Sequence, residues 1–180
     1  MPDTLPDPQD GDRFHIAATA EVMETQPRVL KCGATFGVFN LRGDIMSRER
    51  SAEGVFFDDT RFLSDFRLTV AGGFPMLLGS TVVTKTATLT VDLTNPDIFR
   101  GGVLALQREL LHVQRVKTLG DGRCEEHLRF RFYGEKPIVL PMEIAFGADF
   151  RDIFEVRGTH REKRGRLRPI CRGKDSVILA

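Results

Sequence analysis

The chain has 180 residues, of which 41% are apolar and 28% are charged, as is typical of one soluble globular domain. Its 26 basic and 25 acidic residues nearly cancel, so no net field would attract a polyanion, and this argues against nucleic-acid binding. No apolar run approaches the ~20 residues that span a bilayer, and the first residues lack the pattern of a secretory signal, so we expect no membrane partner.

The cysteine pattern points to a reducing compartment. Cys32, Cys124 and Cys171 are far apart and odd in number, and they show no zinc or disulfide spacing. We therefore expect a cytoplasmic protein. The sequence also lacks a glycine-rich phosphate loop, a nucleophile elbow and a zinc motif, so we expect no cofactor and no metal.

Residues 1–28 are predicted to be a disordered or extended segment, because the first residues are rich in proline and aspartate and offer little to bury. Residues 29–180 are predicted to form one β-sandwich domain. From Val29 onward the dominant signal is an alternation of apolar and polar residues. Successive side chains of a strand point to opposite faces, so each apolar row predicts the buried face of a half-exposed strand. The clearest rows are Phe66, Leu68 and Val70; Ala87, Leu89, Val91 and Leu93; Leu128, Phe130 and Phe132; and Ile138, Leu140, Met142, Ile144 and Phe146.

Glycine-containing turn signals separate the rows. They are Arg42-Gly43-Asp44, Gly72-Gly73, Gly120-Asp121-Gly122 and the segment from Gly134 to Pro137. One segment, Val103–Leu119, fits a helix about as well as a strand, and its flanking hairpin signals favour a strand. Long antiparallel strands without helical interludes predict an all-β fold, an antiparallel β-sandwich with few or no helices.

Two charged motifs interrupt this pattern. In Phe56–Leu63, Asp59 and Arg61 would point the same way on a strand, so they could pair or bind a ligand. In Ala148–Gly158, Asp149, Asp152 and Glu155 follow a three-residue spacing, which would place them on one face of a helical turn.

The second motif has two interpretations. Paired carboxylates could serve as general acid and base, as glycosidases require. Alternatively, Asp149, Asp152 and Glu155 could form a salt-bridge network with Arg151, Arg157 and Arg61, and the balance of acids and bases favours this network. A cation site built from Asp58, Asp59, Asp149 and Asp152 lacks any ligand-loop spacing.

Two further features bear on function. The aromatic residues are 14 Phe, one Tyr and no Trp, which favours a core or a domain interface over a sugar-binding platform. The chain stops inside the apolar run Val177–Leu179, so we expect it to be a truncated part of a longer protein.

The order and spacing of these motifs resemble the N-terminal domain of bacterial glycogen debranching enzymes of the amylo-α-1,6-glucosidase type. The resemblance extends over roughly Val29 to Gly165. It is carried by Leu30–Gly33 with Phe36 and Val38, Gly43–Ile45, Phe57–Leu63, Thr94–Pro96, Arg108 and, most specifically, Ala148–Gly158.

The resemblance implies a β-sandwich that precedes an (α/α)-barrel, which would carry the catalytic acids. It therefore implies no catalytic residue here, the chain's own C-terminal catalytic domain as partner, and a possible α-glucan contact. The residues to which it gives a structural or interdomain role are Asp59, Thr60, Arg61, Asp149, Asp152, Glu155 and Arg157. Two alternatives stay open: a stand-alone carbohydrate-binding module, and a small enzyme that uses Asp149, Asp152 or Glu155.

Overall fold

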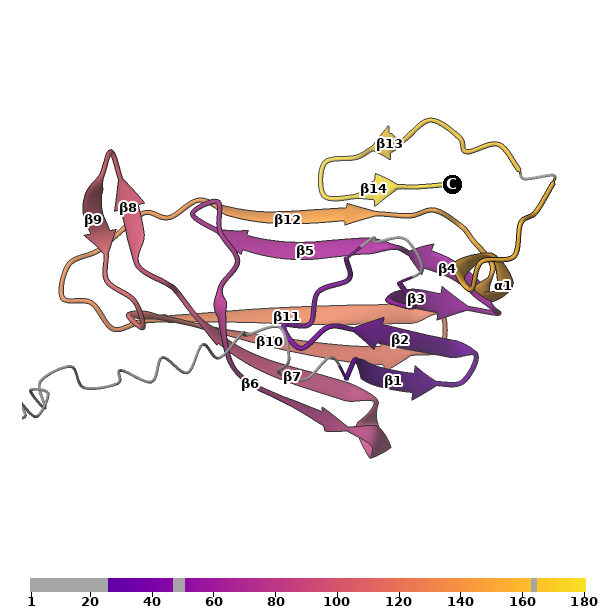
Figure 1. The fold of residues 1–180 in the computed structure, drawn as a ribbon, viewed down its shortest axis with the longest axis horizontal. Coiled ribbons are helices and arrows are strands. Elements are labelled where there is room, and N and C mark those ends of the chain that lie inside the picture. The colour runs from indigo at the N-terminus through magenta and orange to yellow at the C-terminus, as the bar shows by residue number, and fades with distance from the viewer. Residues whose placement is uncertain (1–25, 47–50, 163–164) are drawn as a thin grey trace, which may run out of the picture.

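The protein is described here by a computed structural model over residues 26–46, 51–162 and 165–180 (Figure 1). Antiparallel strands dominate, and the one α-helix in these ranges has four residues, so the predicted all-β class is confirmed. The strands are β1 (Arg28–Cys32), β2 (Thr35–Phe39), β3 (Gly54–Phe57), β4 (Thr60–Leu63), β5 (Asp65–Val70), β6 (Met76–Val83), β7 (Thr88–Thr94), β8 (Ile98–Arg100), β9 (Val103–Leu106), β10 (Leu111–Gly120), β11 (Arg123–Phe132), β12 (Met142–Gly147), β13 (Cys171–Arg172) and β14 (Val177–Ile178); the helices are η1 (Thr84–Thr86) and α1 (Ile153–Val156).

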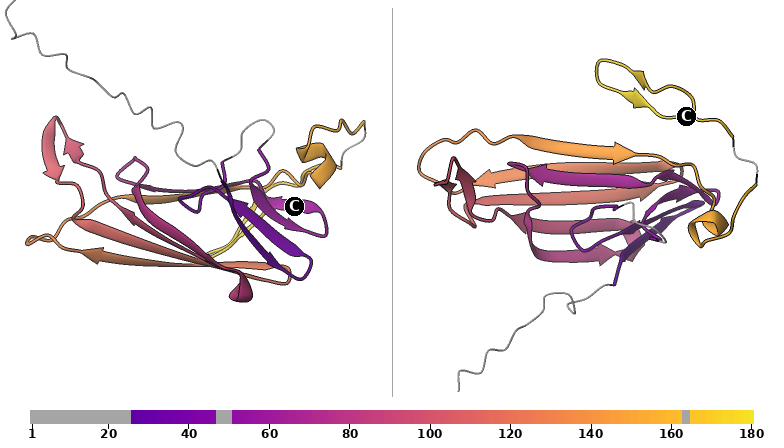
Figure 2. Two further views of the ribbon diagram at one scale, coloured as in Figure 1. Left: turned by 60° about the horizontal axis from the view of Figure 1, so that its bottom comes forward. Right: turned by 45° about the horizontal axis from the view of Figure 1, so that its top comes forward.

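The strands form two facing layers (Figure 2). One layer is the four-stranded sheet β11-β10-β7-β6. The other combines the sheet β1-β2-β3-β4 with the pair β12-β5. Ile45, in the connection between β2 and β3, joins the two parts of this second layer, because its backbone exchanges hydrogen bonds of 2.8 and 2.9 Å with Phe66 of β5.

The core lies between the layers, where the predicted rows meet. Leu89, Val91 and Leu93 of β7 are wholly buried, and Leu68 of β5 is 1% exposed. Phe39, at the end of β2, is also wholly buried and packs in the same cluster. The rows predicted for β5 and β7 are thus the faces that these strands bury.

The single strand predicted over Val103–Leu119 is wrong, because a turn separates β9 from β10. The buried side chain of Asn95 holds this turn: its Oδ1 accepts from Leu111 N at 2.7 Å and its Nδ2 donates to Gln107 O at 2.8 Å. Glu109, between them, has a positive φ of 67°. An amide side chain therefore satisfies the backbone groups that a continuous strand would have paired.

The last predicted row is only partly correct. Ile138 and Leu140 precede β12 rather than belonging to it. Met142, Ile144 and Phe146 of β12 face the core side, yet they are 48%, 40% and 47% exposed. Phe130 of the row predicted for β11 is likewise 41% exposed. The sandwich is therefore open along the side where β11 and β12 lie.

Residues 1–25, most of the segment predicted to be disordered or extended, lie outside the described residues. Within the described ranges, no helix is long and apolar enough to cross a membrane.

Candidate functional site

The two charged motifs meet at one end of the sandwich, beside α1 (Figure 1). Asp58 and Asp59 form the tight turn between β3 and β4, and both have positive φ angles, 44° and 61°. This conformation suits a two-residue hairpin loop, whose backbone twist matches that of its strands. The turn directs β4 toward the chain that leaves β12.

Backbone hydrogen bonds then join the motifs. Arg61 N donates to Arg151 O at 2.8 Å, and Ile153 N donates to Asp59 O at 2.9 Å. Thr60 and Asp152 form an antiparallel bridge between these bonds. The second motif thus pairs with the edge of β4 as a short added strand.

The buried side chain of Arg61 stabilises this pairing between β4 and the second motif. Its Nε and Nη2 donate to the two oxygens of Asp149 at 3.0 and 2.5 Å. Its Nη1 donates to the carbonyls of Ser51 and Glu53 at 3.2 and 3.1 Å. Arg61 is 5% exposed, so this two-pronged ion pair is largely shielded from water. A Cβ on Gly54 would lie 2.5 Å from Arg61 Cδ, so glycine there leaves room for the arginine.

Asp152 and Glu155 organise the short helix α1. Asp152 is its N-cap residue and accepts from Glu155 N at 2.8 Å, while Glu155 accepts from Asp152 N at 3.1 Å. This reciprocal pair is a capping box. The second oxygen of Asp152 lies 2.6 Å from Arg161 Nη2.

The predicted site residues therefore fall into two groups. Asp149 pairs with Arg61 and Arg151, and Asp152 pairs with Arg161. Glu155 contacts Asp152 in the capping box of α1. The suggested pair of Asp59 and Arg61 is wrong, because Arg61 binds Asp149 instead.

Arg157 is the C-cap residue of α1. It ends α1 through its backbone N–H, which donates to Ile153 O at 3.1 Å. Its side chain is exposed and makes no ion pair with any described residue. The expectation that Arg157 neutralises the carboxylates is therefore not met; Arg61, Arg151 and Arg161 make the contacts instead.

The contacts limit what this site can do chemically. Both oxygens of Asp149 and both of Asp152 are engaged by arginines or backbone N–H groups. A general acid or base needs a carboxyl group that can reach the substrate. Across the described residues, no three metal-ligating side chains gather as a cation site. The arrangement therefore holds two segments of the same chain together.

A second charged cluster lies inside the sandwich. Arg115 and Lys117 of β10 point into the core, and each is 1% exposed. Glu126 of β11 accepts from Arg115 Nε and from Lys117 Nζ, both at 2.7 Å. Asp44 accepts from Arg115 Nη1 at 2.5 Å. The ammonium of Lys117 also lies 4.2 Å from the centre of the Phe66 ring.

Burial shifts the protonation of this cluster. It lowers the pKa of Lys117 to about 8, an effect that Arg115 reinforces and Glu126 opposes. For Arg115 burial alone would lower the pKa, but attraction by Glu126 and Asp44 raises it above its usual value. The sequence contained a signal for this cluster, because Arg115 and Lys117 occupy the inward positions of a row that otherwise reads Leu111, Val113 and Leu119.

The comparisons with known proteins agree with this architecture. Searches of curated proteins and of solved structures each found no match. A family model described as the N-terminal domain of (some) glycogen debranching enzymes matches residues 30–180. The matched range contains both charged motifs, the buried cluster and every strand after the first residues of β1. The chain therefore belongs to the family of N-terminal domains of glycogen debranching enzymes.

Proposed function

We propose that this chain is the non-catalytic β-sandwich domain of a glycogen-debranching-type glycoside hydrolase, resembling those of the amylo-α-1,6-glucosidase type. It would support and orient a helical catalytic barrel in the same cytoplasmic protein. Any α-glucan would then be held where the two domains meet. The unpaired state of Cys32, Cys124 and Cys171 is in keeping with a reducing compartment.

One observation carries this proposal: the acidic residues of the most specific motif are engaged in folding contacts. Asp149 is bound by Arg61, and Asp152 and Glu155 cap α1. Carboxylates so engaged serve poorly as the two catalytic acids of a glycosidase. Hydrolysis would therefore fall to acids outside this domain.

The surface around α1 offers a suitable contact for a neighbouring domain. Phe154 is 62% exposed on the outer side of the helix. Arg151 and Arg157, at the two ends of the helix, are exposed as well. Interfaces between domains are more polar than cores, and a single aromatic anchor often supplies much of their affinity. Phe154 would be that anchor.

The interface can be tested with a separately produced catalytic barrel of a glycogen debranching enzyme. We expect the chain to bind it as a one-to-one complex in titration calorimetry and to raise its thermal midpoint. Phe154→Ala should weaken binding about tenfold or more, the usual effect of truncating an aromatic anchor. The matched control is Phe99→Ala, because Phe99 is 61% exposed on β8, and β8 lies at the opposite end of the molecule from α1 (Figure 1). Equal effects of both substitutions, or no complex, would contradict the proposal.

The alternative functions are tested with the isolated chain. We expect no retention on a glycogen column and no release of glucose from a branched limit dextrin. Retention would favour a stand-alone carbohydrate-binding module. Hydrolysis that is abolished by Asp152→Asn and Glu155→Gln would favour a small enzyme.

A further inference from the structure

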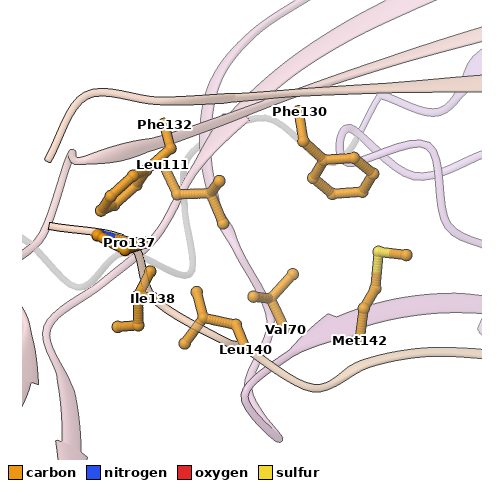
Figure 3. A pocket seen from close by; sticks show the side chains of 8 residues that line it. All are labelled: Val70, Leu111, Phe130, Phe132, Pro137, Ile138, Leu140 and Met142. Carbon is orange, nitrogen blue, oxygen red and sulfur yellow. The ribbon is translucent and has the colours of Figure 1, made fainter.

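The sandwich has an open side bounded by β11 and β12. Each is the edge strand of its sheet, and among the described residues each pairs along one side only. Between them lies a cleft of about 400 Å³ (Figure 3). Its lining is entirely apolar and consists of Val70, Leu111, Phe130, Phe132, Pro137, Ile138, Leu140 and Met142.

The exposure of this side comes from a missing neighbour and not from an outward orientation. Ile144 of β12 lies directly across from Leu68 of β5, on the same face of the sheet. Leu68 is 1% exposed, whereas Ile144 is 40% exposed. A further strand beside β12 would cover its inward row and use its unpaired backbone groups.

The C-terminal hairpin of the same chain has the size and pattern of such a strand pair. Among the residues that the structure describes, β13 and β14 pair only with each other, with Cys171 opposite Ile178 and Arg172 opposite Val177. Arg168 N donates to Ala180 O at 2.6 Å, which extends this pairing toward the base of the hairpin. The right-hand view of Figure 2 shows the hairpin apart from the sandwich, on the side where β12 forms the edge.

The two faces of the hairpin differ in charge. Cys171 and Ile178 are register partners, so they share one face of the hairpin, and neither is charged. Their neighbours Arg172 and Val177 share the opposite face. Cys171 is exposed and Ile178 is 61% exposed, so the uncharged face is not buried in the arrangement seen.

We propose that the free edge of β12 is the docking surface for this hairpin, residues Leu167–Ala180 of the same chain. The uncharged face would then continue the inward row of β12 and cover the cleft. The opposite face would bring Arg172 beside Glu143, which points outward on β12. The two side chains carry opposite charges, and neither makes an ion pair within the described part of the chain, so each is available to the other.

The connection between the two surfaces is long enough. The chain is held near α1 by the hydrogen bond from Thr159 N to Phe154 O, 2.9 Å long. The residues from there to Cys171 can span about 40 Å when extended. β12 itself has six residues and is about 20 Å long. The hairpin can therefore reach any point along β12.

Cys171 lies on the face that would dock, so it can report docking directly. In a background with Cys32→Ser and Cys124→Ser, Ile144→Cys places a second thiol on the inward row of β12. Mild oxidation should then form an intramolecular disulfide, seen as loss of both free thiols in a chain that stays monomeric. The matched control is Thr81→Cys, an exposed position on β6, the far edge of the other layer. The effective thiol concentration near a docked strand is of millimolar order, so we expect at least a tenfold faster reaction than in the control.

Three outcomes would overturn the proposal. Equal rates at positions 144 and 81 would show that the hairpin does not select β12. Disulfides formed only between chains would assign the edge to a second copy. Unreactive thiols in a variant whose circular dichroism is native would show that the hairpin stays away. Met142→Cys serves as a second reporter in case Ile144→Cys does not fold.

The charge arrangement gives an independent test. Glu143→Lys should slow the cross-linking of Cys171 severalfold, because the lysine would face Arg172 and repel it. Adding Arg172→Glu should restore the rate, which a general loss of stability would not allow. Slowing that Arg172→Glu fails to reverse would contradict the predicted orientation. Binding of the catalytic barrel is a separate readout, so failure here leaves the proposed function unaffected.

Discussion

The guanidinium of Arg61 and the carboxylate of Asp149 form a two-pronged ion pair although they are 88 residues apart in the chain. Their side chains are 6% and 25% exposed. The pair ties the β3–β4 hairpin to the segment that follows β12, and it does so next to the backbone bonds between Arg61 and Arg151. The charged motifs thus hold together two parts of the fold that are far apart in the sequence.

Arg61→Ala should lower the free energy of unfolding by about 2–4 kcal/mol. The substitution strands the carboxylate of Asp149 and removes the donors that satisfy Ser51 O and Glu53 O. Urea unfolding followed by circular dichroism measures the loss.

Two other arginines serve as controls for Arg61. Arg67 also holds an aspartate at two points, Asp65, but its side chain is 40% exposed. Arg67→Ala should therefore cost less than about 1 kcal/mol. Arg157→Ala should change stability by less than about 0.5 kcal/mol, since that side chain is exposed and has no ion-pair partner among the described residues. Similar losses for all three variants would refute the special role of Arg61.

Substitutions of Asp152 should separate its cap from its ion pair. Asp152→Ala removes both and should cost about 1 kcal/mol, the usual effect of losing an N-cap. Asp152→Asn keeps a good cap and loses only the charge toward Arg161, which is half exposed, so it should cost a few tenths of a kcal/mol. Thermal unfolding compares the two, and a larger loss for asparagine than for alanine would contradict this division.

Lys117 should make stability depend on pH in the alkaline range. Its pKa is about 8 in the folded protein and 10.5 when unperturbed, so the unfolded chain binds more protons between these values. Stability therefore rises with pH in this window and is independent of Lys117 titration below it. Relative to Lys117→Met, we expect the protein to gain up to about 1.4 kcal/mol per pH unit in urea unfolding between pH 8 and 10. A constant difference between the two proteins would contradict the lowered pKa.

Asp59→Gly should stabilise the protein by up to about 1 kcal/mol. Asp59 has a φ of 61°, a conformation that glycine adopts without a steric penalty, and its backbone carbonyl still accepts from Ile153 N. Thr60→Gly, one residue later in β4, should instead destabilise by about 0.5–1 kcal/mol. Chemical unfolding of both variants tests the turn, and a loss of stability in Asp59→Gly would mean that its carboxylate has a structural role.

The sequence predicted the strands where alternation is strict and where glycine marks the turn. The row of β7 and the turn between Gly120 and Arg123 are examples, because local pattern and tertiary burial agree there. The break at Gln107–Leu110 was not predictable, since it depends on the side chain of Asn95. The alternation of apolar and polar residues cannot reveal a contact between a side chain and a distant backbone group.

The candidate site shows the same division. The residue types of both motifs were identified from sequence, but the partner of Arg61 was not, because the pairing depends on how β4 and the chain after β12 are brought together. The buried pair of Arg115 and Lys117 occupied inward positions of a strand pattern. Basic residues at such positions are a usable sign of an internal ion cluster.

The order of the strands determines how the domain would respond to a break in its backbone. The β8–β9 hairpin projects from the body, with Gly101 and Gly102 at its tip (Figure 1). A nick there would divide the domain into two polypeptides that still pair with each other in both layers, since β7 pairs with β10 and β5 with β12. Each half would hold the other in place across both layers, so the domain is suited to reassembly from two complementary fragments.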